Sequence, residues 1–132
     1  MDLDFSKLDG LLPAVIQDAA SGEVLMLGFM NAEAYAATRA SGEVTFYSRS
    51  RNKVWRKGEQ SGHVLKVRDI RVDCDVDTLL IRVEALGPGV CHEGYRSCFF
   101  RRIIANGEAK VVEDRVFDPK AVYGSATGKD KK

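Results

Sequence analysis

The sequence lacks any long apolar run. Its longest, at residues 24–30, is far shorter than the roughly 20 residues that span a bilayer. The N-terminus also lacks the basic and apolar regions of a signal peptide. We therefore expect a cytoplasmic protein with no membrane partner. Only three cysteines are present, and an odd number cannot all pair within one chain. They are better interpreted as thiols that are buried, metal-binding or catalytic.

The chain also lacks a strong excess of charge, with 20 basic against 19 acidic residues and a net charge of +1. This balance argues against a nucleic-acid partner, although a local basic patch is compatible with it. A length of 132 residues suits one domain with a real core. We expect that domain over residues 1–123. The last nine residues, 124–132, are rich in Gly, Ser, Thr and Lys and are expected to form a disordered tail.

Hydrophobic patterning predicts an α+β fold dominated by strands. Residues 32–40 are Ala-rich and follow Asn31, a good N-cap, so they predict the one principal helix. Residues 48–62 are polar and are expected to form a loop. The expected strands, which form a mixed or antiparallel sheet, are residues 14–18, 23–27, 44–47, 64–72, 78–84, 98–104 and, as a short final strand, 110–112.

Three aspartates alternate in the segment Val72-Asp73-Cys74-Asp75-Val76-Asp77. If this segment is extended, the three carboxylates share one face. They would repel one another without a cation, and hard oxygen ligands suit Mg²⁺ or Ca²⁺. A solvated acidic loop is the open alternative. An EF-hand is excluded, because its sixth position would be Thr78 where a glycine is needed.

Two further cysteines, Cys91 and Cys98, flank a glycine-containing loop that also holds His92. Together with Cys74 they could hold one Zn²⁺ and leave a fourth position for water, the arrangement of a catalytic zinc. Three alternatives stay open at this point. The thiols could be small buried hydrophobes, His92 could close a structural zinc site, or a Cys/His pair could act as a nucleophile.

Five basic residues fall within nine positions, 49–57, around the single tryptophan, Trp55. Arginine matches the geometry of phosphate, and an indole ring can stack on a base. This pattern favours an anionic ligand. A solvated loop with Trp55 packed inward and a single-strand binder are the alternatives, and the net charge disfavours the second of these.

Three blocks of the sequence together resemble the phosphoribosyl-AMP cyclohydrolase family of histidine biosynthesis. No single block is specific, but their joint order is. The blocks are LPAVIQD at 12–18 with VLMLGFMN at 24–31, FYSRSR at 46–51 with Trp55 and KGEQSG at 57–62, and DCDVD at 73–77 with CHEGYRSCF at 91–99.

This resemblance implies an intertwined homodimer of the monofunctional form that hydrolyses the N1–C6 bond of the adenine ring of phosphoribosyl-AMP, a small nucleotide. It implies that zinc is shared between subunits, with Cys74 from one chain and Cys91 and Cys98 from the other. It also implies magnesium ligands at Asp73, Asp75 and Asp77.

The chemistry of a three-thiolate zinc makes a general base desirable, because three thiolates leave the bound water less acidic than three imidazoles would. His92 is the candidate, since its ordinary pKa lies near operating pH. Glu93 is a weaker candidate, and a purely structural role for His92 is the alternative. Trp55 is expected to stack on the base or to pack. The expected phosphate-binding residues are Arg49, Arg51, Lys57 and Arg96.

Overall fold

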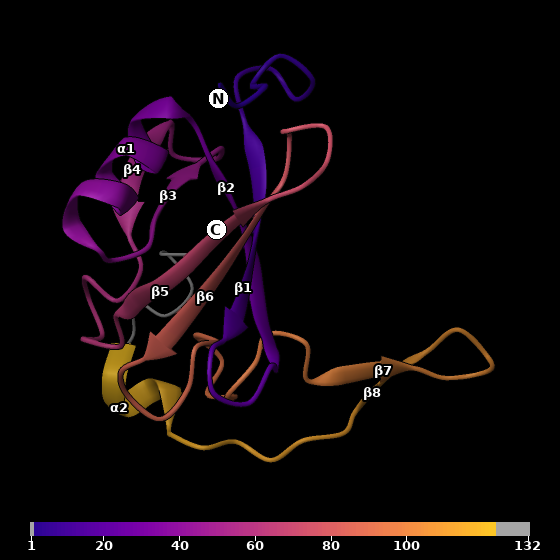
Figure 1. The fold of residues 1–132 in the computed structure, drawn as a ribbon. Helices are drawn as coiled ribbons and strands as arrows, with labels where there is room; N and C mark the ends of the chain where they lie inside the picture. The colour runs from indigo at the N-terminus through magenta and orange to yellow at the C-terminus, as the bar shows by residue number, and fades with distance from the viewer. Residues whose placement is uncertain (1, 124–132) are drawn as a thin grey trace.

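A mixed four-stranded sheet organises the chain (Figure 1). The computed structural model describes residues 2–123, so the expected tail lies outside the described residues. The strand order is β2 (Val24–Met30), β1 (Leu12–Asp18), β6 (Leu79–Ala85) and β5 (Leu65–Val72). β1 and β6 are parallel, and the other neighbouring pairs are antiparallel. The prediction of a strand-rich α+β fold with a mixed sheet is confirmed.

The first hairpin is held by its turn. The Asp18 carboxylate accepts a hydrogen bond of 2.8 Å from the backbone N–H of Ser21, and Gly22 takes a positive φ of 80°, which glycine adopts without strain. β2 ends three residues later than the expected 27, because its ladder with β1 continues to the pair Leu12 and Met30.

Helix α1 (Ala32–Ser41) has the predicted N-cap. The Asn31 side chain accepts from the N–H of Ala34 at 2.8 Å, and Gly42 ends the helix in the left-handed region. The hydroxyl of the fully buried Thr38 accepts from Thr45 N–H at 3.0 Å and lies 3.1 Å from the Thr45 carbonyl. These bonds tie the helix to the next strand.

The expected loop at 48–62 is wrong over five residues, which are Ser48 and Lys53–Arg56. β4 (Lys53–Arg56) pairs with β3 (Thr45–Ser48) as a two-stranded hairpin. Phe46 lies opposite Trp55, with ring centroids 5.5 Å apart. The exposed Lys53 and Arg56 make the segment polar in composition. The strand forms because the cross-strand pair of Trp55 and Phe46 stabilises the hairpin.

The expected strand at 98–104 is shortened to β7 (Arg101–Ile103), which pairs with β8 (Ala109–Val111). Cys98 is excluded from the strand because its N–H donates to the carbonyl of Leu25 at 2.7 Å. The β7–β8 hairpin projects from the body as an arm, and residues 101–112 are all exposed. A short helix that the sequence pattern did not predict, α2 (Pro119–Tyr123), follows.

The two faces of the main sheet are covered unequally. Its inner face is fully buried through Leu12, Ala14, Ile16, Leu79, Ile81 and Val83, and α1 and the β3–β4 hairpin lie on that side. The opposite face carries Val15, Leu27 and Leu80, which are neighbours across three strands and are only half-buried. Within the described part of the chain, no helix is long and apolar enough to cross a membrane.

Substituting Gly28 tests how tightly this core is packed. A Cβ added there would lie 2.5 Å from the ring of Phe46, which is fully buried and has no space to move. Gly28→Ala should therefore lower the free energy of unfolding by about 1–3 kcal/mol, measured by urea denaturation. Phe46→Leu in the Gly28→Ala background should recover part of the loss. Additive effects of the two changes would contradict the direct clash.

Candidate active site at the two ends of the sheet

The three alternating aspartates form an acid cluster in the β5–β6 turn. Single carboxylate oxygens of Asp73, Asp75 and Asp77 all lie within 4.8 Å of one another. A turn at residues 74–76 brings them together, so the condition that the segment is extended is not met. Val76 has a positive φ of 58°, and one Asp73 oxygen accepts from the N–H groups of Asp77 and Thr78 at 3.0 and 3.2 Å.

A lysine from the N-terminal segment already neutralises part of this cluster. Lys7 Nζ lies 2.9 Å from an oxygen of Asp75 and 2.9 Å from an oxygen of Asp77. Chiefly because of Lys7, the pKa of Asp77 falls to about 2, and the two carboxylates raise the pKa of Lys7. The oxygen spacing also suits a hard cation, since oxygens on opposite sides of Mg²⁺ or Ca²⁺ lie about 4–5 Å apart. The acid cluster is thus a possible metal site.

An open cleft of about 860 Å³ lies beside the acid cluster. Arg49 is in its wall, where its guanidinium carbon lies 4.1 Å from the centroid of the Phe29 ring. Arg51 follows in the β3–β4 turn, where its N–H donates to Ser48 Oγ at 3.2 Å. The lining residues are Lys7, Leu8, Asp9, Gly10, Leu11, Phe29, Asn31, Tyr47, Arg49 and Asn52.

The other two cysteines form a thiol pair near the opposite end of the sheet. Cys91 is 3% exposed and Cys98 is partly exposed. The loop between them is anchored on β2, because Ser97 Oγ donates to the Val24 carbonyl at 2.8 Å and Cys98 N–H donates to Leu25. Cys91 N–H also donates to the Tyr95 carbonyl at 3.1 Å.

The surroundings of the thiol pair favour the thiolate, the form that binds metal. A hydrogen bond with the Cys98 side chain lowers the pKa of Cys91 from 9.0 to about 6, and the positive charge of Lys57 also lowers the pKa of Cys91. Burial acts in the opposite direction and is outweighed. A thiophilic cation such as Zn²⁺ fits this donor set.

His92, Lys57 and Trp55 line one small cavity next to the thiol pair. His92 is half-buried, whereas Lys57 is 8% exposed and Trp55 is 6% exposed. The Trp55 ring packs in the core, and its indole N–H has no hydrogen-bond partner within the described residues. A buried donor of this kind needs an acceptor, so packing and ligand binding are both compatible with this position.

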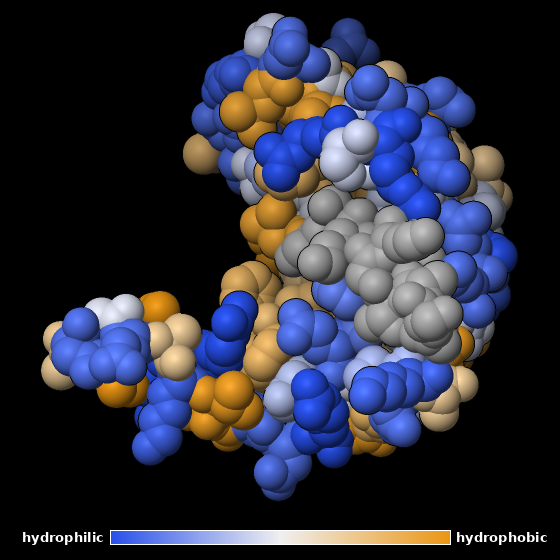
Figure 2. Space-filling model, turned by 180° about the vertical axis from the view of Figure 1, so that it is seen from behind, coloured by the Kyte–Doolittle hydropathy of each residue, from blue (hydrophilic) through white to orange (hydrophobic). Residues whose placement is uncertain are grey.

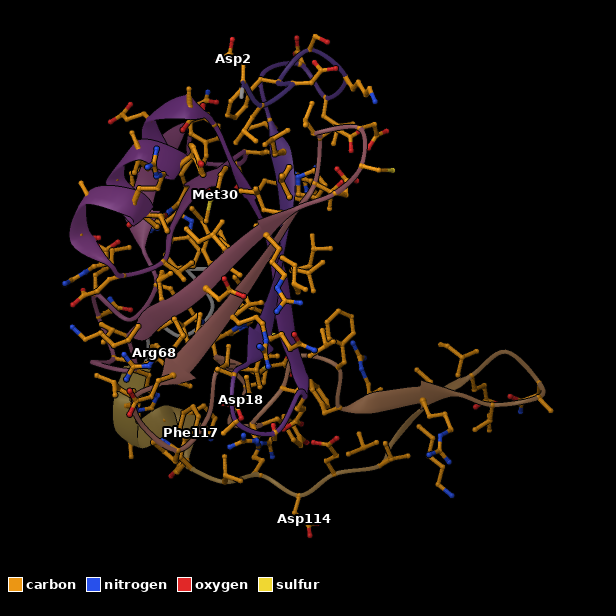
Figure 3. The ribbon with its side chains drawn as sticks, in the orientation of Figure 1. Asp2, Asp18, Met30, Arg68, Asp114 and Phe117 are labelled. Carbon is orange, nitrogen blue, oxygen red and sulfur yellow. The ribbon has the colours of Figure 1, made fainter. Side chains whose placement is uncertain are left out.

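Cys74 does not join the other two thiols. Among the described residues, the acid cluster is the only group of three or more such side chains close enough to hold a metal. Cys74 is exposed in the β5–β6 turn, at the end of the sheet where the chain begins. The loop of the thiol pair is anchored on Val24 and Leu25, at the start of β2. This is the end of the sheet that Asp18 marks in Figure 3, whereas Asp2 marks the other end. β1 has seven residues, so the two ends lie roughly 20 Å apart.

Arg96 belongs to the thiol end and is engaged within the chain. Its guanidinium forms an ion pair with Glu23 and lies 3.5 Å from the Asp18 carboxylate. Chiefly because of Glu23, the pKa of Arg96 is raised. Arg96 therefore links the Cys91–Cys98 loop to the β1–β2 turn, and it does not line the cleft that holds Arg49.

Two residues of interest were missed by the pattern analysis. Lys7 is a single lysine in an acidic segment, and its partners are 68 and 70 residues away, so no local pattern marks it. His63 Nδ1 lies 3.2 Å from the Gly89 carbonyl, and its ring meets Phe117 edge-on at 5.0 Å. In the sequence His63 is a lone histidine that belongs to no motif.

Comparison with known proteins now identifies the class. Residues 26–100 match the family model described as phosphoribosyl-AMP cyclohydrolase. A phosphoribosyl-AMP cyclohydrolase of Solibacter usitatus is 62% identical over 124 residues, covering 94% of this chain and 98% of the relative. The proteins of the same name from Desulforapulum autotrophicum and Pelotomaculum thermopropionicum are 52% and 51% identical. They are matched over 93% of this chain and over 98% and 96% of their own lengths.

The chain belongs to the phosphoribosyl-AMP cyclohydrolase family. The resemblance carried by the three sequence blocks is thereby confirmed, and the match spans both ends of the sheet.

The electrostatics of the thiol pair can be tested without metal. Cys98→Ala should raise the pKa of Cys91 from about 6 toward 9.0, because the thiolate loses the hydrogen bond that favours it. The measurement is thiolate absorbance against pH in chelator-treated protein, with Cys74→Ala as the matched control that leaves the Cys91 transition in place. An unchanged Cys91 transition in Cys98→Ala would contradict the assignment.

Proposed function

We propose that this cyclohydrolase acts as a zinc-dependent homodimer, formed by the domain over residues 1–123, that hydrolyses the N1–C6 bond of phosphoribosyl-AMP in histidine biosynthesis. Membership of the family supplies the activity. The shared zinc site and the homodimer are supported by the separation of Cys74 from the thiol pair. One chain cannot place the three thiols around one ion, whereas two chains related by a twofold axis can.

The uncovered surfaces of the chain support a dimer. Val15, Leu27 and Leu80 leave apolar area on the outer face of the sheet. The arm adds Ile103, 70% exposed, and Val111, 49% exposed. Figure 2 shows apolar surface lining the hollow between the arm and the body. Burying these surfaces against a second copy would remove a large contiguous apolar patch from water.

Each proposed site then combines the two ends of the sheet. One chain would supply Cys74 and the acid cluster, and its partner would supply Cys91, Cys98 and the adjacent His92. Zinc bound there would lower the pKa of a water molecule and so supply the nucleophile. We assign magnesium to Asp73, Asp75 and Asp77, and the spacing of their oxygens within 4.8 Å supports this assignment.

The hydrolysis adds the oxygen of water to C6 of the adenine ring and breaks the C6–N1 bond. We assign to His92 the removal of a proton from the attacking water and to the same imidazolium its delivery to N1, the leaving nitrogen. This general acid–base role suits an imidazole, whose reference pKa lies near operating pH. Lys57 lies beside His92 and adds positive charge where negative charge develops on the ring.

The substrate carries two phosphate groups, and we assign their binding to the basic residues. Arg49 is best placed, because it lines the cleft, and Arg51 and Lys57 follow it in the same hairpin region. Arg96 would have to exchange Glu23 for a phosphate. For Trp55, the indole N–H finds no hydrogen-bond partner among residues 2–123, which supports a contact with substrate, while its ring continues to pack on Phe46.

Complementation between two inactive variants tests the shared site. Cys74→Ala and Cys91→Ala should each lack bound zinc and turnover. Refolded together, they should regain about one quarter of wild-type activity, because half of the dimers are mixed and each mixed dimer has one intact site. The assay follows ring opening by ultraviolet absorbance, with zinc content measured in parallel.

Two controls define the outcome. Cys91→Ala mixed with Cys98→Ala should stay inactive, since both changes fall on the same side of the interface. If the Cys74 and Cys91 variants also stay inactive together although mixed dimers form, the three thiols do not act across the interface.

Replacing His92 separates catalysis from metal binding. His92→Gln should lower kcat by about 10²- to 10⁴-fold, as expected for loss of a general base, with zinc content unchanged. Glu93→Gln is the matched control and should keep most activity. Loss of zinc together with activity in His92→Gln would instead make His92 a ligand.

A further inference from the structure

The N-terminal segment connects the acid cluster to the cleft. Asp4 N–H donates to the carbonyl of Val76 at 2.8 Å, which fixes this segment against the β5–β6 turn. Three residues on, Lys7 reaches both Asp75 and Asp77 and also lines the cleft. The side chain of Lys7 thus contacts both the acid cluster, where we propose a divalent cation, and the cleft, where we propose a phosphate group.

The ammonium group of Lys7 and a divalent cation compete for the same oxygens. A metal bound by Asp75 and Asp77 would sit about 2.0–2.6 Å from their oxygens, in the space that now faces Lys7 Nζ. The two like charges would also repel at this distance. Metal binding therefore requires Lys7 to leave the cluster.

The cleft offers Lys7 a second position. Its side chain is 46% exposed, so it is not enclosed in the cluster. Arg49 stands in the wall of the same cleft, and one carboxylate, Asp9, lies there as well. With Lys7 turned into the cleft, two cations against one carboxylate would face an anionic ligand there, which suits a phosphate group.

We propose that Lys7 exchanges between the acid cluster and the cleft, so that a divalent cation bound by the aspartates releases its ammonium group to bind a substrate phosphate. The inference rests on the proposed magnesium and phosphate sites. Its consequence is positive coupling between metal and nucleotide, which must be equal in both directions.

The first experiment measures Mn²⁺ binding by electron paramagnetic resonance of the free ion. Binding at the acid cluster is the difference between the Mn²⁺ bound by wild type and the Mn²⁺ bound by Asp75→Asn. Lys7→Gln should bind Mn²⁺ at this site about 3- to 10-fold more tightly than wild type, the range expected on removing an exposed competing cation. The matched control is Lys66→Gln, because Lys66 is 42% exposed and also pairs with a carboxylate, Glu43, at 2.7 Å.

The second experiment measures AMP binding by calorimetry with and without saturating Mn²⁺, corrected for the Mn²⁺–AMP complex. Wild type and Lys66→Gln should bind AMP at least about 3-fold more tightly with the metal, and AMP should tighten Mn²⁺ binding by the same factor. In Lys7→Gln the coupling should vanish.

The outcomes distinguish failure of the Lys7 exchange from failure of the proposed magnesium site. If Asp75→Asn removes no Mn²⁺ binding, the proposed magnesium site and the Lys7 exchange both fail. If the site exists but Lys7→Gln binds Mn²⁺ no more tightly than wild type, the exchange alone is wrong. Coupling that persists in Lys7→Gln would mean that the metal contacts the nucleotide directly, and this too overturns the exchange.

Discussion

The parallel pairing of β1 with β6 is the constraint on which the placement of every candidate residue depends. Because these strands run in the same direction, the turn that leads into β6 lies near the start of β1, beside the N-terminal segment. The β1–β2 turn and the loop anchored on β2 lie near the other end. The sheet thereby separates the acid cluster and Cys74 from Cys91 and Cys98 within a single chain.

Each end contains its own counter-charge. The acid cluster holds the ammonium group of Lys7 at 2.9 Å from two carboxylates. At the other end, the Cys98 side chain and Lys57 favour the thiolate of Cys91. Both arrangements keep a concentrated charge tolerable in an isolated chain. Each counter-charge acts at one end of the sheet only.

Periodicity predicted the elements whose signals are local. The Asn31 cap, the helix and the strands of the main sheet were predictable because alternation and capping act within a few residues. β4 was not, since its strand character comes from the pairing of Trp55 with Phe46 across the hairpin. The alternation of the three aspartates suggested a shared face only for an extended segment, whereas a turn brings their oxygens together. The resemblance implied the ligands by position, while Lys7 depends on a contact across some 70 residues and has no local signal.

The burial of Trp55 gives the chain an intrinsic fluorescent probe. It is the only tryptophan in the sequence, so all indole fluorescence originates at one point. That point lies between Phe46 in the core and the ammonium group of Lys57, 5.9 Å from the ring centroid. Since the same ring lines the cavity that His92 shares, its emission reports both core packing and the state of the thiol end. Folding and occupancy of that end can thus be followed in the unmodified chain, without an attached dye.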